Sequence, residues 1–108
     1  MAFKIAKKPT FTAKVDVYTP NNKGGHDYST FEAEFSRCKM SELDGLRSKN
    51  QFDVMREKLV GWKDFNDEDN NPVEFTPENL EILIDIPEAL QGLREAFWGS
   101  VVKAKEKN

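Results

Sequence analysis

The sequence has one cysteine, one histidine and no long apolar run, and each absence excludes a class of protein. Cys38 alone cannot form an internal disulfide, which favours a reducing compartment such as the cytoplasm. No apolar run approaches the roughly 18 residues of a membrane span, and the start MAFKIAKKP lacks the apolar centre of a signal peptide. The net charge of −3 disfavours nucleic acid as the main partner, because a phosphate backbone requires a basic face.

What the sequence does contain is enough apolar and aromatic material for one modest core. The 108 residues are 38% hydrophobic and 32% charged, and they include eight Phe and two Trp. A chain of this length supports one core, so we expect a single domain over residues 1–108. Residues 1–9 are basic, and we expect them to be flexible.

Residues 10–36 have the pattern of a β-hairpin. Apolar side chains alternate with polar ones on both sides of a turn rich in Pro, Asn and Gly, residues 19–26. The alternating apolar residues are Phe11, Ala13, Val15 and Val17 before the turn, and Phe31, Ala33 and Phe35 after it. A lone hairpin is marginally stable in water, so this face must lie against helices or another chain.

Residues 41–105 have helical patterns. One interrupted helix or two short ones are expected from about Ser41 to Val60, ending at Gly61. Thr76 and Pro77 mark a second helix start, since Thr is a capping residue and Pro fits the first turn. Pro87 begins the last helix, whose apolar stripe comprises Leu90, Leu93, Phe97, Val101 and Ala104. The sequence thus predicts an α+β fold: an N-terminal β-hairpin packed on a C-terminal bundle of three to four short helices, with more than half of the chain helical.

The most unusual segment is Asp64–Glu88, which has nine carboxylates and no Lys or Arg. Asp67, Asp69 and Asn71 alternate, and Glu78 lies where a twelve-residue calcium loop has its last ligand. However, such a loop requires Gly where this chain has Pro72, and Thr76 and Pro77 would start a helix inside it. We therefore predict a solvated turn followed by a capped helix, with no metal site.

Nothing in the sequence predicts catalysis. A nucleophilic pair of Cys38 and His26 would require a motif or an orienting group, and neither residue has one. Gly24 and Gly25 belong to the hairpin turn and form no phosphate-binding loop. We therefore expect no enzyme activity and no cofactor.

Protein contacts are the more plausible chemistry, and the last helix carries the clearest candidates. Trp98 and Val102 fall outside its apolar stripe, so they either pack on the hairpin of the same chain or contact a partner. The candidate partner or oligomer contacts are Trp98, Val102, Trp62, Phe65, Phe31 and Phe35. Basic ends and an acidic middle would also suit head-to-tail association.

The order of several motifs resembles that of the tail assembly chaperones of long-tailed bacteriophages and prophages. The similar features are F-x-A-x-V-x-V (Phe11 to Val17), T-F-E-A-E-F (Thr30 to Phe35), L-V-G-W (Leu59 to Trp62), an acidic D-E-D-N-N-P turn, F-T-P-E-N-L (Phe75 to Leu80) and a closing helix with A-F-W. They span residues 10–108, and W-x-x-F followed by the acidic turn and F-T-P-E-N-L is the most specific part.

This resemblance implies a small, non-catalytic protein of the bacterial host cytoplasm. It would bind the tape measure protein, help recruit tail tube subunits and associate with itself. Two alternatives stay open: a structural virion component, such as a tail tube or head-tail joining subunit, and a small acidic regulatory or inhibitor protein. The high helical content expected here disfavours a β-rich tube subunit.

Overall fold

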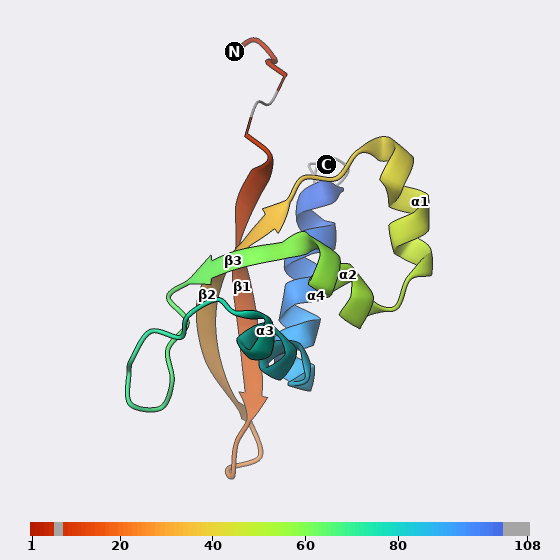
Figure 1. The fold of residues 1–108 in the computed structure, drawn as a ribbon. Coiled ribbons are helices and arrows are strands. Elements are labelled where there is room, and N and C mark those ends of the chain that lie inside the picture. Colours follow the sequence, from red (N-terminus) through yellow and green to blue (C-terminus); the bar gives the residue numbers. More distant parts are fainter. Residues whose placement is uncertain (6–7, 103–108) are drawn as a thin grey trace.

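A computed structural model describes residues 1–5 and 8–102, which adopt an α+β fold (Figure 1). One antiparallel sheet has the strand order β1-β2-β3, with β1 at Thr10–Pro20, β2 at His26–Ser36 and β3 at Leu59–Lys63. The four helices are α1 (Met40–Ser48), α2 (Gln51–Lys58), α3 (Pro77–Ile84) and α4 (Pro87–Val101). The predicted fold class, an N-terminal hairpin with helices after it, is confirmed.

The hairpin follows from the alternation in the sequence. β1 and β2 pair without interruption from Thr10 opposite Ser36 to Pro20 opposite His26. The turn is closed by the side chain of Asn21, whose Oδ1 accepts hydrogen bonds from the backbone N–H groups of residues 23 and 25 at 3.0 and 3.1 Å. Gly24 has φ +82°, a conformation that favours glycine.

The third strand was not predicted. Helix α2 ends at Lys58, and Leu59–Lys63 pairs with β2, so the expectation that a helix continues to Val60 and ends at Gly61 is wrong. Within β3, Gly61 lies opposite Glu34, and a Cβ at this glycine would lie 2.9 Å from the Glu34 Oε1 atom. The missing side chain therefore leaves room for that carboxylate within the sheet.

The first helical region consists of two short helices, one of the two arrangements that the sequence allowed. They are separated at Lys49 and Asn50, and the Asn50 side chain caps α2 by accepting a hydrogen bond from the Asp53 backbone N–H at 2.9 Å. Because residues 59–63 form a strand and residues 64–76 form a loop, helices account for less than half of the described residues. The expectation that more than half of the chain is helical is therefore wrong.

The two later helices begin where the sequence predicted. Thr76 Oγ1 accepts a hydrogen bond from the Asn79 backbone N–H at 3.0 Å, which caps α3, and Pro87 is the first residue of α4. Leu93 and Phe97 of the predicted stripe are buried. Residues 103–105, with Ala104, lie outside the described residues.

The core lies between one face of the sheet and the helices. Helix α4, blue in Figure 1, runs beside β1. The aromatic ring of Phe97 on α4 contacts that of Phe35 on β2, with the ring centroids 5.2 Å apart. The approach is close at Gly92, where a Cβ would lie only 2.3 Å from the Asp16 carbonyl oxygen. Val54 and Met55 of α2 complete this part of the core.

Of the residues before β1, Pro9 is tied to the sheet, whereas residues 1–5 are exposed. The Pro9 carbonyl oxygen accepts the Arg37 backbone N–H at 2.8 Å, which ties Pro9 to the end of β2. Residues 1–5 have no regular structure and are exposed. The flexibility expected for residues 1–9 stays a prediction. Within the described chain, no helix has the length and apolar character needed to cross a membrane.

Candidate binding surfaces

The acidic turn is organised by its own hydrogen bonds. Asp67 Oδ1 accepts the backbone N–H groups of Asp69 and Asn71 at 2.8 and 3.0 Å, and Asn70 has φ +64°. An aspartate that satisfies backbone donors in this way forms a polar turn. Among residues 1–5 and 8–102, no group of three or more His, Cys, Asp or Glu side chains is arranged to hold a metal ion.

Cys38 and His26 lie near opposite ends of β2. At about 3.3 Å per residue, their positions along the chain are separated by roughly 40 Å, so they cannot act as a nucleophile and its base. Burial raises the pKa of the Cys38 thiol, which keeps it in its less reactive form.

Two of the predicted contact residues belong to the core. Phe35 is fully buried and Phe31 is 6% exposed, both on the sheet face that packs on the helices. Phe35 is not accessible on the surface, and Phe31 is accessible only to a small extent, where it lines a groove described below. The sequence pattern showed this face but could not show which part of the chain covers it.

Trp62 and Phe65 anchor the acidic loop to the sheet. The Trp62 indole N–H donates to the Val73 carbonyl oxygen at 2.8 Å, and its ring contacts Phe65 and Phe75 with centroids 5.1 and 4.7 Å apart. Phe65 also contacts Phe31 at 5.6 Å. Both predicted residues are half-buried, and their main contacts are within the chain.

Trp98 and Val102 are brought together at the carboxyl end of α4. The Trp98 indole N–H donates to Gln51 Oε1 at 3.3 Å, its ring meets Phe97 edge-on, and the Arg47 guanidinium lies 5.9 Å from the ring centroid. One side of this tryptophan is therefore held by α1 and α2. The sequence left two alternatives for Trp98, packing on the hairpin or contact with a partner, and neither included contacts with α1 and α2.

The remaining side of Trp98 faces an open groove, which we call the α4 groove. It has a volume of about 540 Å³ and is lined by Gln91, Arg94, Glu95, Trp98, Gly99 and Val102. Its rim is polar, since the Arg94 guanidinium donates to Gln91 Oε1 at 2.6 Å. A Cβ at Gly99 would meet no atom within 4 Å, so the chain leaves this position open.

A second groove lies between the turn end of the hairpin, the acidic loop and the start of α4. It has a volume of about 560 Å³, and we call it the acid-rimmed groove. Its apolar lining is Val17, Phe31, Phe65, Leu83, Ile86 and Ala89. The charged residues that line it are Asp64, Glu68 and Glu88, and none of its lining residues is basic.

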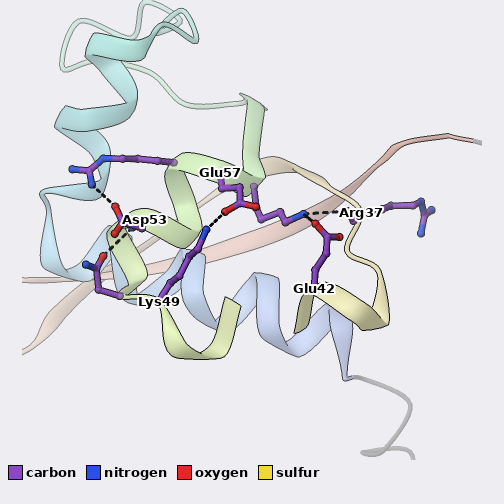
Figure 2. Close-up of polar contacts among 8 residues, drawn as sticks. Arg37, Glu42, Lys49, Asp53 and Glu57 are labelled. Carbon is purple, nitrogen blue, oxygen red and sulfur yellow. Dashed lines mark hydrogen bonds and ion pairs between the residues drawn. The ribbon is translucent and has the colours of Figure 1, made fainter. Parts of the chain in front are cut away.

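A polar cluster that the sequence pattern did not predict stabilises helices α1 and α2, beside the α4 groove. Lys58 is 4% exposed, and its Nζ donates to Glu42 Oε2 at 3.2 Å and to the Arg37 carbonyl oxygen at 3.4 Å. In Figure 2, dashed lines join this amine to the Glu42 carboxylate and to the backbone of Arg37, whose side chain points away, and the Lys49–Glu57 ion pair lies beside them. The signal was present, because position 58 follows the buried positions 54 and 55 at helical spacing.

The Lys58 cluster also affects the acidity of its carboxylate. The Lys39 backbone N–H donates to Glu42 Oε1 at 2.7 Å, and this bond, followed by the one from Lys58, holds the pKa of Glu42 below its ordinary value. On the other side of α2, Arg56 forms two hydrogen bonds with Glu81 of α3 at 2.7 and 2.8 Å, and these lower the pKa of Glu81. The contact between Glu42 and Lys58 joins α1 to α2, and the contact between Arg56 and Glu81 joins α2 to α3.

The two grooves offer aromatic and aliphatic anchors with charged rims, which is the chemistry of protein docking. The α4 groove joins two of the residues predicted to make contacts, and the acid-rimmed groove includes Phe31 and Phe65 in its lining. No significant match to the chain was found among protein-family models, curated proteins or solved structures.

Proposed function

We propose that this chain is a phage tail assembly chaperone, a non-catalytic protein of the bacterial host cytoplasm that binds the tape measure protein. In this role it also helps recruit tail tube subunits. The order of motifs along the sequence supports the assignment to this class. The observation that carries the binding mode is the α4 groove, in which Trp98, in the last turn of the helix, lies beside Val102, the residue that caps its carboxyl end.

The binding mode follows from the chemistry of the client. A long helical protein that is not yet enclosed exposes apolar stripes, which aggregate unless another surface covers them. Trp98 and Val102 repeat at the i, i+4 spacing of such a stripe, and the open position at Gly99 lets a second helix approach closely. We infer that a client helix packs lengthwise along α4.

The acidic segment has a different part in this proposal. Most of its carboxylates are exposed on the loop and on α3, away from the buried side chains. A surface of one charge sign repels other copies of the same complex, which maintains solubility. The segment would therefore keep complexes of the chaperone and its client from aggregating, without contacting the client itself.

The test is co-expression of the chain with the tape measure gene of the same locus, followed by affinity capture. The variant Gly99→Leu adds a large side chain at a position that lines the α4 groove, and the Cβ of that side chain would have no atom of another part of the chain within 4 Å. The matched control is Gly45→Leu on α1, where a Cβ also meets nothing within 4 Å.

The wild type and Gly45→Leu should capture the tape measure protein, and Gly99→Leu should capture at least tenfold less, because about 1.4 kcal/mol of lost contact gives that factor. Equal capture by both variants would exclude the α4 groove as the binding surface. Failure of the wild type to capture the tape measure protein would exclude the function.

A further inference from the structure

Arg94, which lines the α4 groove, has a buried hydrogen-bond donor that the described part of the chain leaves unpaired. Its Nη1 donates to Gln91 Oε1 at 2.6 Å, but its Nε is buried and has no hydrogen-bond partner among residues 1–5 and 8–102. A buried N–H group without an acceptor destabilises a fold, and most such groups in proteins are paired. An unpaired donor beside a groove therefore indicates an acceptor that arrives with the partner.

Arg56 on α2 shows how a guanidinium is paired elsewhere in this chain. Its Nη1 donates to Asp53 Oδ1 at 2.9 Å, while its Nε and Nη2 donate side by side to the two carboxylate oxygens of Glu81 at 2.7 and 2.8 Å. Arg94 likewise uses its Nη1 for one neighbour, Gln91. The edge that contains its Nε is therefore the edge with which Arg56 holds a carboxylate, and the planar fork of a guanidinium matches the two oxygens of that group.

The charges around the groove favour an anionic acceptor. In the described part of the chain, none of the ion pairs includes Arg94. The next residue, Glu95, directs its Oε2 to Gln91 Nε2 instead, at 2.8 Å. A second guanidinium, that of Arg47, lies 5.9 Å from the Trp98 ring centroid. An approaching carboxylate would therefore meet two positive groups beside the apolar surface of the tryptophan.

We propose that Arg94 recognises a carboxylate of the client, through parallel hydrogen bonds from Nε and Nη2. The inference rests on the proposed function, in which the client is the tape measure protein packed along α4. Arg94 is half-buried at the groove, so a turn about its own side-chain bonds brings the Nε edge toward the client.

The position of Arg94 also specifies the pattern of the client. Arg94 precedes Trp98 by four residues, and side chains at this spacing on a helix are neighbours, with Cβ atoms about 5 to 6 Å apart. A client helix that packs lengthwise along α4 should therefore carry Asp or Glu three or four residues from the apolar residue that covers Trp98. Arg94 thus determines specificity, because an apolar stripe without this carboxylate leaves the buried donor unpaired.

The test repeats the co-expression and affinity capture with substitutions that change the charge at position 94 in steps. Capture should fall about tenfold for Arg94→Gln, which removes the charge, and about a hundredfold for Arg94→Glu, which places like charges opposite each other. Arg94→Lys keeps the charge without the fork, so it should capture an intermediate amount. The controls Lys23→Gln and Lys23→Glu change the net charge equally at an exposed position of the hairpin turn, and they should capture as the wild type does.

Two further measurements separate recognition from a structural role. In urea unfolding, purified Arg94→Gln should be at least as stable as the wild type, because the substitution removes a buried donor that the free chain leaves unpaired. Salt should weaken capture by the wild type more than capture by Arg94→Gln, because the Debye length falls from about 10 Å at 0.1 M to about 3 Å at 1 M.

The outcomes distinguish this inference from the function on which it rests. If the wild type captures the tape measure protein and Arg94→Glu captures as much as Arg94→Gln, no carboxylate faces position 94 and the inference is overturned, while the function stands. A loss of capture that accompanies a loss of stability also overturns it, because Arg94 then has a structural role. A wild type that captures no tape measure protein excludes the proposed function and this inference with it.

Discussion

The close packing of α4 on β1 gives the sharpest prediction of stability, through the substitution Gly92→Ala. A Cβ at this position would lie 2.3 Å from the Asp16 carbonyl oxygen and 3.0 Å from a methyl group of Val15. The first obstacle is backbone, so it cannot move aside as a flexible side chain would. The helix must shift by most of an ångström or the strand must bend.

Two effects of opposite sign set the magnitude. Alanine in place of glycine inside a helix stabilises by about 1 kcal/mol. Overpacking costs about 1 to 3 kcal/mol, and the upper end applies here because a displaced α4 also loosens Leu93 and Phe97, which are fully buried. The net expectation is a loss of about 2 kcal/mol, which lowers the melting temperature by roughly 10 °C for a domain of this size.

The assay is urea unfolding followed by circular dichroism, with Gly45→Ala and Gly99→Ala as controls. A Cβ meets nothing within 4 Å at either control position, so both should gain up to about 1 kcal/mol from helix propensity alone. The reasoning would be refuted if Gly92→Ala were as stable as the wild type or more stable, because propensity would then outweigh the close contact.

Three further predictions concern the cap of α3, the Lys58 cluster and the acidic turn. Thr76→Ala removes the acceptor of the Asn79 N–H and should cost about 1 kcal/mol in urea unfolding, while Thr76→Ser should cost little. The folded-state pKa of Glu42 is lowered, so the stability that this carboxylate contributes is fully present above the unfolded pKa of about 4.3 and is lost as the pH falls through the folded pKa. The variant Glu42→Gln lacks this carboxylate, so it should lose less stability on acidification than the control Asp44→Asn. Calcium titrated to millimolar concentration should leave the tryptophan fluorescence unchanged. A transition at micromolar calcium would contradict this and show that the acidic turn binds the ion.

Much of the fold could be predicted because local signals agreed with the packing. The alternation around the turn determined the hairpin, and Thr76 and Pro87 fixed the starts of two helices. Strand β3 could not be predicted in the same way, since Leu59 also continues the helical spacing of Val54 and Met55. What decides its conformation is the open edge of β2, whose residue Phe35 pairs with Leu59, and that edge is distant in sequence.

The candidate surfaces were predicted in part. The position of Trp98 outside the stripe of α4 indicated a second contact face, and the structure places Val102 with it in one groove. The partner of Trp98 inside the chain, Gln51, is 47 positions away, and no local pattern relates the two. Periodicity likewise showed the apolar face that includes Phe31, but only the tertiary arrangement shows that helices of the same chain cover it, with α4 packed along β1.

The soluble fraction of the tape measure protein, expressed with and without this chain, tests the central claim most directly. If the chain is its chaperone, co-expression should move the tape measure protein from the pellet to the soluble fraction, and Gly99→Leu should reverse most of that gain while Gly45→Leu preserves it. A tape measure protein that is equally insoluble with and without the wild-type chain would contradict the proposed function.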